Sequence, residues 1–452
     1  MACALIALAE THAHDNGFIG FDARAVAAAF DAPTPDAPPD GPLAGIPFAV
    51  KDNIDALPFP TTGGCPALGK HHPATDAPAV ARVRAAGARL VGKTNLHELA
   101  IGVTSNNTVF GPVRNPYDRR RIAGGSSGGN GAVIARGIVP FALGTDTGGS
   151  VRIPAAFCDI AGFRPTSGRY PDGGVLMLSP TRDTVGVMAA TVADAALVDA
   201  VIAPAEDVPL PAWPLRLGVL AGARAGLAAV VDATIAAALD RLADAGVALV
   251  PVDDPELEGL EERMGNAIVI CEAAGWWHRF TSQQLGLSLM DFAEEIASPD
   301  VRDLFERMEA LAIGHRPDYR AAMAGGRAAL QARCAALFAG QGLDALVTAT
   351  VPVQPPLIGE DDDFMADGIA LPTLVTLTRA SALASIAGLP SLSIPAGLDR
   401  SGLPVGLQLD GPAGSDRRLL AIGEVVEKVL DGVPLSPRGR GRGPLAVGPV
   451  GG

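Results

Sequence analysis

Short apolar runs alternate with helix-like segments over the first third of the chain. One apolar run covers residues 46–50 and ends at Lys51, and a second covers residues 138–143. Between them, residues 76–87 form an Ala-rich stretch with Pro78 near its start and a glycine at its end, a pattern typical of a helix. This alternation of strands and helices predicts an α/β layered structure.

Further elements follow from the same patterns. Additional strands are predicted at residues 89–91, 215–220, 247–252, 345–350, 392–395 and 403–409. Additional helices are predicted at residues 2–9, 95–100, 132–135 and 227–245, and a capping-box sequence at 191–194 begins another. The long stretch from 257 to 340 is mostly helical in character.

A single large domain is predicted over residues 1–432, because no clear linker divides residues 41–432. Within it, the helical residues 257–340 are expected to form an inserted layer that caps the domain. Residues 433–452 are rich in Gly, Pro and Arg, and this composition predicts a disordered tail.

Composition narrows the class of protein. Of the 452 residues, 48% are hydrophobic and 19% are charged, so the chain can build a large core and is not disordered throughout. Its net charge is -14, and the basic runs at 119–121 and 438–442 are not interleaved with aromatic residues. We therefore expect no nucleic-acid partner. No apolar run approaches the roughly 20 residues that a membrane-spanning helix needs, so we expect no membrane partner either.

The cysteines bear on the compartment and on metal binding. There are five, widely spaced, with no CxxC motif and no Cys/His cluster at zinc spacing. An odd number of distant cysteines fits reduced thiols better than a disulfide framework. The sequence thus predicts a cytoplasmic protein without a metal site.

Three polar features stand in apolar or Gly-rich surroundings, namely Lys51, the pair Ser126 and Ser127, and Ser150. Amide hydrolysis needs a nucleophile, a group that takes its proton, and donors for the oxyanion. Because no His lies in a comparable Gly/Ser setting, a desolvated Lys is the candidate base for a Ser nucleophile. Successive N–H groups at 148–150 can form an oxyanion nest.

Each of these features alone has a simpler interpretation. Lys51 can be a surface residue after a strand, and the Gly/Ser run at 124–131 can be a flexible loop. A Gly-rich loop can also cradle phosphate, although neither Gly run fits the GxxxxGK[ST] pattern.

Longer motifs decide between these interpretations. They are GIPFAVKDNID (45–55), GKTNLHELAIG (92–102), GPVRNPYD (111–118), AGGSSGGNGA (123–132), LGTDTGGSVRIPAAFCDIAGFRPT (143–166) and GLPVGLQLDG (402–411). Together they resemble the amidase signature family of Ser–Ser–Lys hydrolases, over nearly all of residues 41–200 and over 385–430. The resemblance implies one domain with a mixed, multi-stranded central sheet covered by helices on both faces.

The resemblance also implies a catalytic triad. Lys51 corresponds to the family's general base, and Ser126 to its bridging Ser in a cis peptide bond. Ser150 corresponds to the nucleophile that is acylated. The implied reaction needs no cofactor.

Other positions receive supporting roles from the same resemblance. The oxyanion hole is expected from the N–H groups of Thr147, Gly148, Gly149 and Ser150. A hydrogen bond from Ser127 is expected to support the Lys, and Asp146 and Arg152 are expected to organise the site from behind.

Within the family, residues 104–118, 121–129, 162–171 and 179–189 look most like the aryl-acetamide amidases, which are the indoleacetamide and mandelamide hydrolases. We therefore predict hydrolysis of non-peptide carbon–nitrogen bonds in small apolar or aryl amides. The residues expected to line the substrate pocket are Thr104, Ser105, Trp276, Trp277 and Phe280. Plain helical core is the alternative for the three aromatic residues.

Other functions remain open at this point. A carbamate (urethane) presents the same carbonyl–nitrogen geometry, so a carbamate hydrolase with the same mechanism is one alternative. A glutamine-dependent amidotransferase subunit and a non-catalytic scaffold are the others. The expected partner is a small-molecule amide or carbamate, and the expected state is a monomer or a homodimer.

Overall fold

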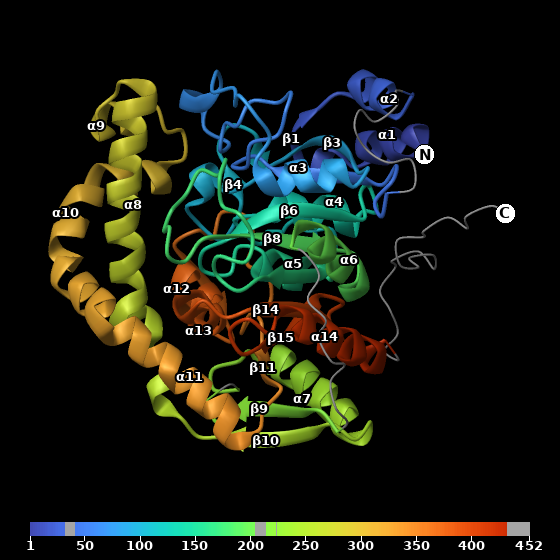
Figure 1. The fold of residues 1–452 in the computed structure, drawn as a ribbon, viewed down its shortest axis with the longest axis vertical. Coiled ribbons are helices and arrows are strands. Elements are labelled where there is room, and N and C mark those ends of the chain that lie inside the picture. The colour runs from blue at the N-terminus through green and yellow to red at the C-terminus, as the bar shows by residue number, and fades with distance from the viewer. Residues whose placement is uncertain (32–40, 204–213, 223, 432–452) are drawn as a thin grey trace.

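An 11-stranded mixed sheet runs through the centre of the molecule (Figure 1). The computed structural model describes residues 1–31, 41–203, 214–222 and 224–431, so the predicted tail at 433–452 lies outside the described residues. Across the sheet the strands are β1 (Phe18–Phe21), β3 (Arg89–Thr94), β2 (Pro47–Lys51), β6 (Phe141–Asp146), β8 (Thr184–Ala189), β7 (Ala161–Arg164), β14 (Ser391–Leu398), β15 (Pro404–Asp410), β11 (Ala345–Ala349), β9 (Arg216–Leu220) and β10 (Ala248–Val252).

Parallel and antiparallel pairs are both present in this sheet. β2 runs parallel to β3 and to β6, and β9 runs parallel to β10 and to β11. The other neighbouring pairs are antiparallel. Two small antiparallel sheets are formed by β4 (Asn106–Asn107) with β5 (Gly111–Pro112) and by β12 (Asp363–Ala366) with β13 (Ile369–Pro372). The predicted α/β fold with a mixed central sheet is confirmed.

Helices cover both faces of the sheet. Alternate residues of each strand point to opposite sides, and both sides carry apolar residues that have to be covered. On β2, Phe48 and Val50 join one hydrophobic cluster, and Ala49 joins the cluster on the other side. The first cluster is covered by α3 (Pro78–Ala85), α6 (Val192–Ile202), α7 (Ala229–Asp244) and α14 (Asp416–Leu430). The second is covered by α1 (Ala2–Thr11), α2 (Ala23–Asp31), α4 (Gly128–Ala135) and α5 (Arg152–Cys158).

The predicted helical character of residues 257–340 is confirmed. Its helices are α8 (Asn266–Phe280), α9 (Leu289–Glu294), α10 (Pro299–Ala321) and α11 (Arg327–Gln341). In Figure 1 they stand side by side along one edge of the molecule, drawn in yellow to orange. The short helices α12 (Thr373–Thr378) and α13 (Ala382–Ala387) lie between this helical layer and the sheet.

The prediction of a helix at 95–100 is wrong. β3 continues to Thr94, and only a single turn follows, at Glu98–Ala100. Leu99 and Ala100 have φ angles of 54° and 61°, in the left-handed region, so no right-handed helix can continue through them.

The elements around the Gly/Ser run are displaced from their predicted bounds. α4 begins at Gly128 rather than at 132, because the glycines themselves are helical. A Cβ at Gly129 would lie 2.4 Å from the carbonyl oxygen of Asn95, so a larger residue could not pack here. The predicted strand at 138–143 starts only at Phe141, since the N–H groups of Gly137 and Ile138 cap the end of α4.

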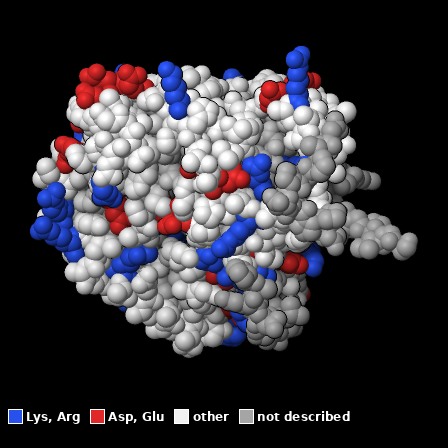
Figure 2. Space-filling model, turned by 45° about the horizontal axis from the view of Figure 1, so that its top comes forward, with Lys and Arg blue, Asp and Glu red and all other residues white. Residues whose placement is uncertain are grey.

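Charged side chains of both signs are interspersed on one face of the molecule. On the face drawn in Figure 2, Lys and Arg lie among Asp and Glu and are separated by uncharged areas. Within the described part of the chain, every helix is too short or too polar to cross a lipid bilayer.

Candidate active site

Lys51 is the last residue of β2, and its side chain is fully buried. Its Nζ lies 2.7 Å from the hydroxyl oxygen of Ser126 and 2.8 Å from that of Thr145. Thr145 is on β6, and the parallel pairing of β2 with β6 brings it next to Lys51. The amine is thus held between two hydroxyl groups at the end of two central strands.

Burial gives this amine unusual acid–base chemistry. It lowers the pKa of Lys51 to about 7, against the opposing effect of the carboxylates of Asp146 and Asp183. Lys93, the other buried lysine of the site region, has a carboxylate partner, with its Nζ 3.1 Å from Asp52. Lys51 contacts hydroxyl groups instead, so its neutral form is populated near neutral pH, as a general base requires.

Ser126 follows a cis peptide bond from Gly125, as the family resemblance implies. Its hydroxyl oxygen is the one that contacts Lys51, and its carbonyl oxygen accepts hydrogen bonds from the N–H of His97 (3.2 Å) and the hydroxyl of Ser105 (3.3 Å). Both ends of this residue are therefore fixed, and its side chain is buried.

Ser127 does not have its expected contact. Its hydroxyl donates to the carbonyl oxygen of Thr145 at 3.4 Å, and the hydrogen bond predicted from Ser127 to Lys51 is made by the Thr145 hydroxyl instead. The N–H of Ser127 donates to the carbonyl oxygen of Ser150 at 3.2 Å. Ser127 thereby joins the segment that carries Ser126 to the segment that carries Ser150.

Three of the four N–H groups predicted for the oxyanion hole are open. Those of Thr147, Gly148 and Ser150 have no hydrogen-bond partner among the described residues, and all three residues line one cavity. The N–H of Gly149 instead donates to the carboxylate of Asp146 at 3.0 Å. Gly149 therefore shapes the loop, with φ of 115°, rather than facing the cavity with its N–H.

Asp146 holds this loop, because its carboxylate accepts the N–H groups of Gly149 and Val151. Burial alone would raise the pKa of its carboxyl, but the guanidinium groups of Arg152 and Arg164 outweigh burial and hold that pKa well below its usual value. Arg152 donates to both carboxylate oxygens, at 3.0 and 2.9 Å. Arg164 adds a further bond of 3.0 Å. The sequence prediction did not include Arg164, although it lies in the matched motif 143–166.

A cavity of about 220 Å³ opens beside Ser150. Its walls come from the loop at 100–103, from α8 and α10, and from α12. The apolar residues that line it from the helices are Val269, Ile270, Ala273, Leu304, Met308 and Leu374. A hydroxyl and three open N–H groups thus face an apolar space.

Thr104 and Ser105 lie outside this cavity, contrary to prediction. The Thr104 hydroxyl donates to Asp361 at 2.6 Å, and the Ser105 hydroxyl accepts from the N–H of Gly128 at 3.1 Å. Both residues are buried, and the Ser105 hydroxyl also donates to the carbonyl oxygen of Ser126 at 3.3 Å.

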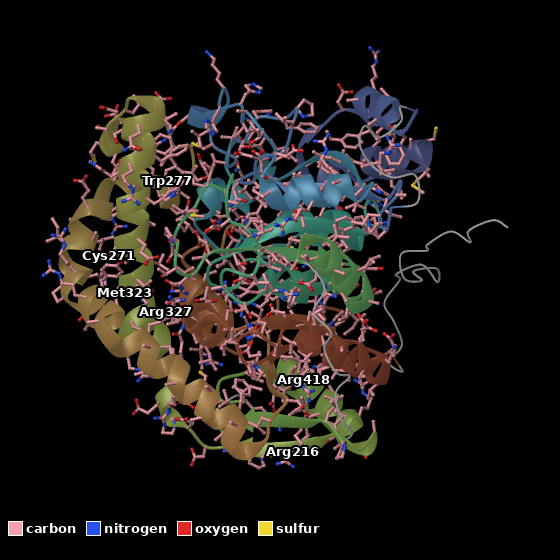
Figure 3. All side chains as sticks on the ribbon, in the orientation of Figure 1. Arg216, Cys271, Trp277, Met323, Arg327 and Arg418 are labelled. Atoms are coloured by element: carbon pink, nitrogen blue, oxygen red, sulfur yellow. The ribbon has the colours of Figure 1, made fainter. Side chains whose placement is uncertain are left out.

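Of the three aromatic residues predicted for the pocket, Trp277 lies in a hydrophobic core cluster, and Trp276 and Phe280 pack against that cluster. Trp277, labelled on α8 in Figure 3, is fully buried and stacks on Phe292, with the ring centroids 5.5 Å apart. Trp276 and Phe280 stack on each other at 4.9 Å within the same cluster. Trp277 lies one helical turn beyond Ala273 on the same stripe of α8, where aromatic rings fill the space.

Replacing Trp277 with Ala is therefore expected to lower stability by about 3–5 kcal/mol, because the substitution leaves a cavity in a filled core. KM for amide substrates should stay within about twofold of the wild-type value. Urea unfolding and steady-state kinetics measure the two effects, with Met290→Ala, an exposed apolar residue of α9, as the control. A tenfold rise in KM for Trp277→Ala, at unchanged stability, would show that Trp277 lines the substrate pocket.

One group of side chains has the composition of a metal site. The ligand atoms of His12, His14 and Asp15 lie within 4.8 Å of one another. However, Asp15 already forms ion pairs with Arg136 at 2.7 Å and with Arg119 at 3.2 Å. Two guanidinium groups on the only carboxylate of the group oppose a bound cation.

Comparison with known proteins connects this geometry to a family. An amidase family model matches residues 7–420. The indoleacetamide hydrolase of Agrobacterium vitis is 40% identical over 404 residues, covering 86% of this chain and 84% of that protein. The mandelamide hydrolase of Pseudomonas putida is 38% identical over 414 residues, covering 88% and 80%. A crystal structure of an amidase has a TM-score of 0.80 at 32% identity and covers 94% of each chain. The similarity therefore extends over the sheet, the site and the helical layer.

Proposed function

The chain belongs to the amidase family and is an enzyme that hydrolyses amide carbon–nitrogen bonds, and from this premise we propose that its substrates are small amides with an apolar, aryl-bearing acyl group. One observation carries the proposal. Ser150 lies beside an apolar cavity that α8 and α10 enclose, and that cavity can receive a ring attached to the amide carbonyl.

The proposed reaction begins with proton transfer toward the buried amine. Neutral Lys51 accepts the hydroxyl proton of Ser126, Ser126 accepts that of Ser150, and the Ser150 oxygen attacks the carbonyl carbon. The distance of 2.7 Å between Nζ of Lys51 and the hydroxyl oxygen of Ser126 supports the first transfer, in which the neutral amine accepts the hydroxyl proton. Among the described residues no hydrogen bond joins the hydroxyls of Ser126 and Ser150, so the second contact has to form when substrate binds.

The tetrahedral oxyanion then rests on the open N–H groups of Thr147, Gly148 and Ser150. Its collapse breaks the carbon–nitrogen bond, and the proton returns through Ser126 to the departing nitrogen, which leaves as ammonia. Water next attacks the acyl group on Ser150, activated by the same Lys51–Ser126 pair, and the carboxylic acid is released. The relay uses side chains of this chain alone.

The acyl preference can be tested at Ile270, a half-buried residue of α8 that lines the cavity. Ile270→Trp fills the space for a ring, so kcat/KM for phenylacetamide and indole-3-acetamide should fall by about 10- to 100-fold, an effect of about 1–3 kcal/mol. kcat/KM for acetamide should change less than threefold. Ile313→Trp on α10, where Ile313 is 65% exposed, is the matched control.

If Ile270→Trp lowers kcat/KM equally for acetamide and for the aryl amides, the assignment of this cavity to the acyl group is contradicted. The same panel, extended to aryl carbamates, aryl esters and glutamine, separates the alternatives. Preferred carbamate turnover would identify a urethane hydrolase, and release of ammonia from glutamine alone would favour an amidotransferase subunit. Ammonia release from aryl amides by the isolated chain supports the proposal.

A further inference from the structure

Thr147, the first residue of the oxyanion loop, is held by two neighbouring side chains that the mechanism does not use. Its hydroxyl donates to the carboxylate of Asp183 at 2.5 Å. Its carbonyl oxygen accepts from Nε of Arg182 at 3.2 Å. The plane of the peptide groups around Thr147 therefore depends on residues 182 and 183.

Asp183 is itself fixed from the other side. Its second carboxylate oxygen accepts the N–H groups of Leu178 (2.7 Å) and Ser179 (2.9 Å). The carboxyl is buried, and burial raises its pKa to about 6 against the effect of the Thr147 hydroxyl. An acceptor held this firmly fixes the direction of the Thr147 side chain.

Arg182 connects the same residue to the helical turn Glu261–Gly265, which continues directly into α8. Its Nη1 lies 3.1 Å from Oε2 of Glu261 and 2.9 Å from the carbonyl oxygen of Gly265, and its Nη2 lies 2.6 Å from Oε1 of Glu261. This is a bidentate Arg–carboxylate pair, a geometry that fixes the orientation of both side chains. Arg182 is 1% exposed, and both Arg182 and Glu261 line the substrate cavity.

A second acidic residue, Glu272 of α8, holds the start of the same segment. Glu272 accepts from the hydroxyl of Ser179 at 2.7 Å and from the N–H of Thr181 at 3.1 Å. The segment 179–183 thus lies between α8 and Thr147, with polar contacts to both. The stretch between Glu261 and Glu272 carries Val269 and Ile270, which line the cavity.

We propose that Arg182 and Asp183 are positioning residues for the oxyanion loop, and that the Arg182–Glu261 pair makes the N–H of Thr147 sensitive to the position of α8. The inference rests on the proposed function, because it assigns the cavity to the acyl group. An acyl ring that packs against α8 holds the helix, and the helix then holds Thr147 through the ion pair. A methyl group, as in acetamide, is too small to contribute this contact.

Glu261→Gln tests the coupling, because it removes the charge of the pair and keeps the shape of the side chain. We expect kcat for phenylacetamide to fall about tenfold, since the loop is displaced while the donor remains and removal of a donor costs about 10²–10³-fold. KM should change less than twofold, and kcat for acetamide should change less than threefold. An equal fall in kcat for both substrates, or a rise in KM at constant kcat, overturns the proposal.

A matched control has the same charge change at an ion pair elsewhere. Arg418, labelled on α14 in Figure 3, pairs with Asp344 at 2.5 Å, outside the cavity. Asp344→Asn should leave the ratio of the two kcat values unchanged. A shift of that ratio equal to the shift in Glu261→Gln would show a general effect of charge loss and would overturn the coupling.

Asp183→Asn gives a second, independent readout. The Asp183 carboxylate interacts with the charges of Arg164 and Lys51, and it raises the pKa of Lys51. Loss of that charge should move the acid limb of kcat/KM to lower pH while kcat falls, because Thr147 loses an anionic acceptor. If the Asp183→Asn variant folds, and both its kcat and the position of the acid limb of its kcat/KM–pH profile match the wild type, the role of Asp183 is overturned.

Failure of the proposed function has a different signature. If wild-type protein releases no ammonia from any aryl amide, the substrate assignment is wrong, irrespective of the variants. If wild-type protein is active and Glu261→Gln lowers kcat equally for large and small acyl groups, only the coupling is wrong.

Discussion

Ser150→Ala is expected to lower kcat for aryl amides by about 10⁴- to 10⁶-fold, because it removes the hydroxyl that we propose as the nucleophile. The open N–H groups of Thr147 and Gly148 remain, so a small residual rate above that of water is expected. Ammonia release measures the rate, and intact-protein mass after acid quenching measures the acyl-enzyme, which should be absent.

The control for this prediction is Ser282→Ala, an exposed serine just beyond the end of α8. It should retain wild-type turnover and acylation. An acyl adduct on the Ser150→Ala protein, or turnover within tenfold of wild type, would assign the nucleophile to a different residue.

Lys51→Met is expected to lower kcat/KM by about 10²- to 10⁴-fold, the range that general base catalysis contributes. Methionine fills about the same buried volume without an amine, so the site can fold while Ser126 loses the group that we propose accepts its proton. The pH dependence should change as well. A Lys can accept a proton only when neutral, and its pKa is lowered to about 7 by burial.

In the wild-type enzyme, kcat/KM should therefore rise about tenfold per pH unit below about pH 7 and level off above it. In Lys51→Met this rise of kcat/KM with pH, the acid limb of the profile, should disappear. Lys428→Met, at a lysine whose side chain is 76% exposed on α14, is the control and should retain the limb. An unchanged limb near pH 7 in Lys51→Met would assign the base to a different group.

Local patterns were sufficient for much of the fold. The apolar run before Lys51 predicted a strand that ends at that residue, and β2 ends there. Thr191 was predicted to begin a helix, and its hydroxyl accepts the N–H of Asp194 at the start of α6. The strand pattern missed β1, β7 and β8, each of which contains a glycine that interrupts its run of apolar residues.

The aromatic residues of α8 show why the pocket was predicted incorrectly. A periodic stripe identifies a helix face, and the stripe through Ile270, Ala273 and Trp277 is visible in the sequence. Whether this stripe borders the cavity or the core depends on its neighbours in space. Phe292 and Phe305 belong to other helices and pack against Trp277, so the stripe borders core there. No local pattern carries that information.

The family resemblance, together with the pattern of glycines and serines, predicted the residues of the proposed relay, and the structure places Lys51 in contact with Ser126. What the sequence determined by itself was local, namely the strand that ends at Lys51, the helix that begins after Thr191, and the Gly-rich loop that carries Ser150. The tertiary structure decided the partners: Thr145 rather than Ser127 at the amine, and α8 as the wall of the cavity. Lys51 and Thr145 are 94 positions apart in the chain, and the register of β2 against β6 brings them together. No short stretch of sequence specifies such a register, because it depends on how two distant strands pair within the assembled sheet.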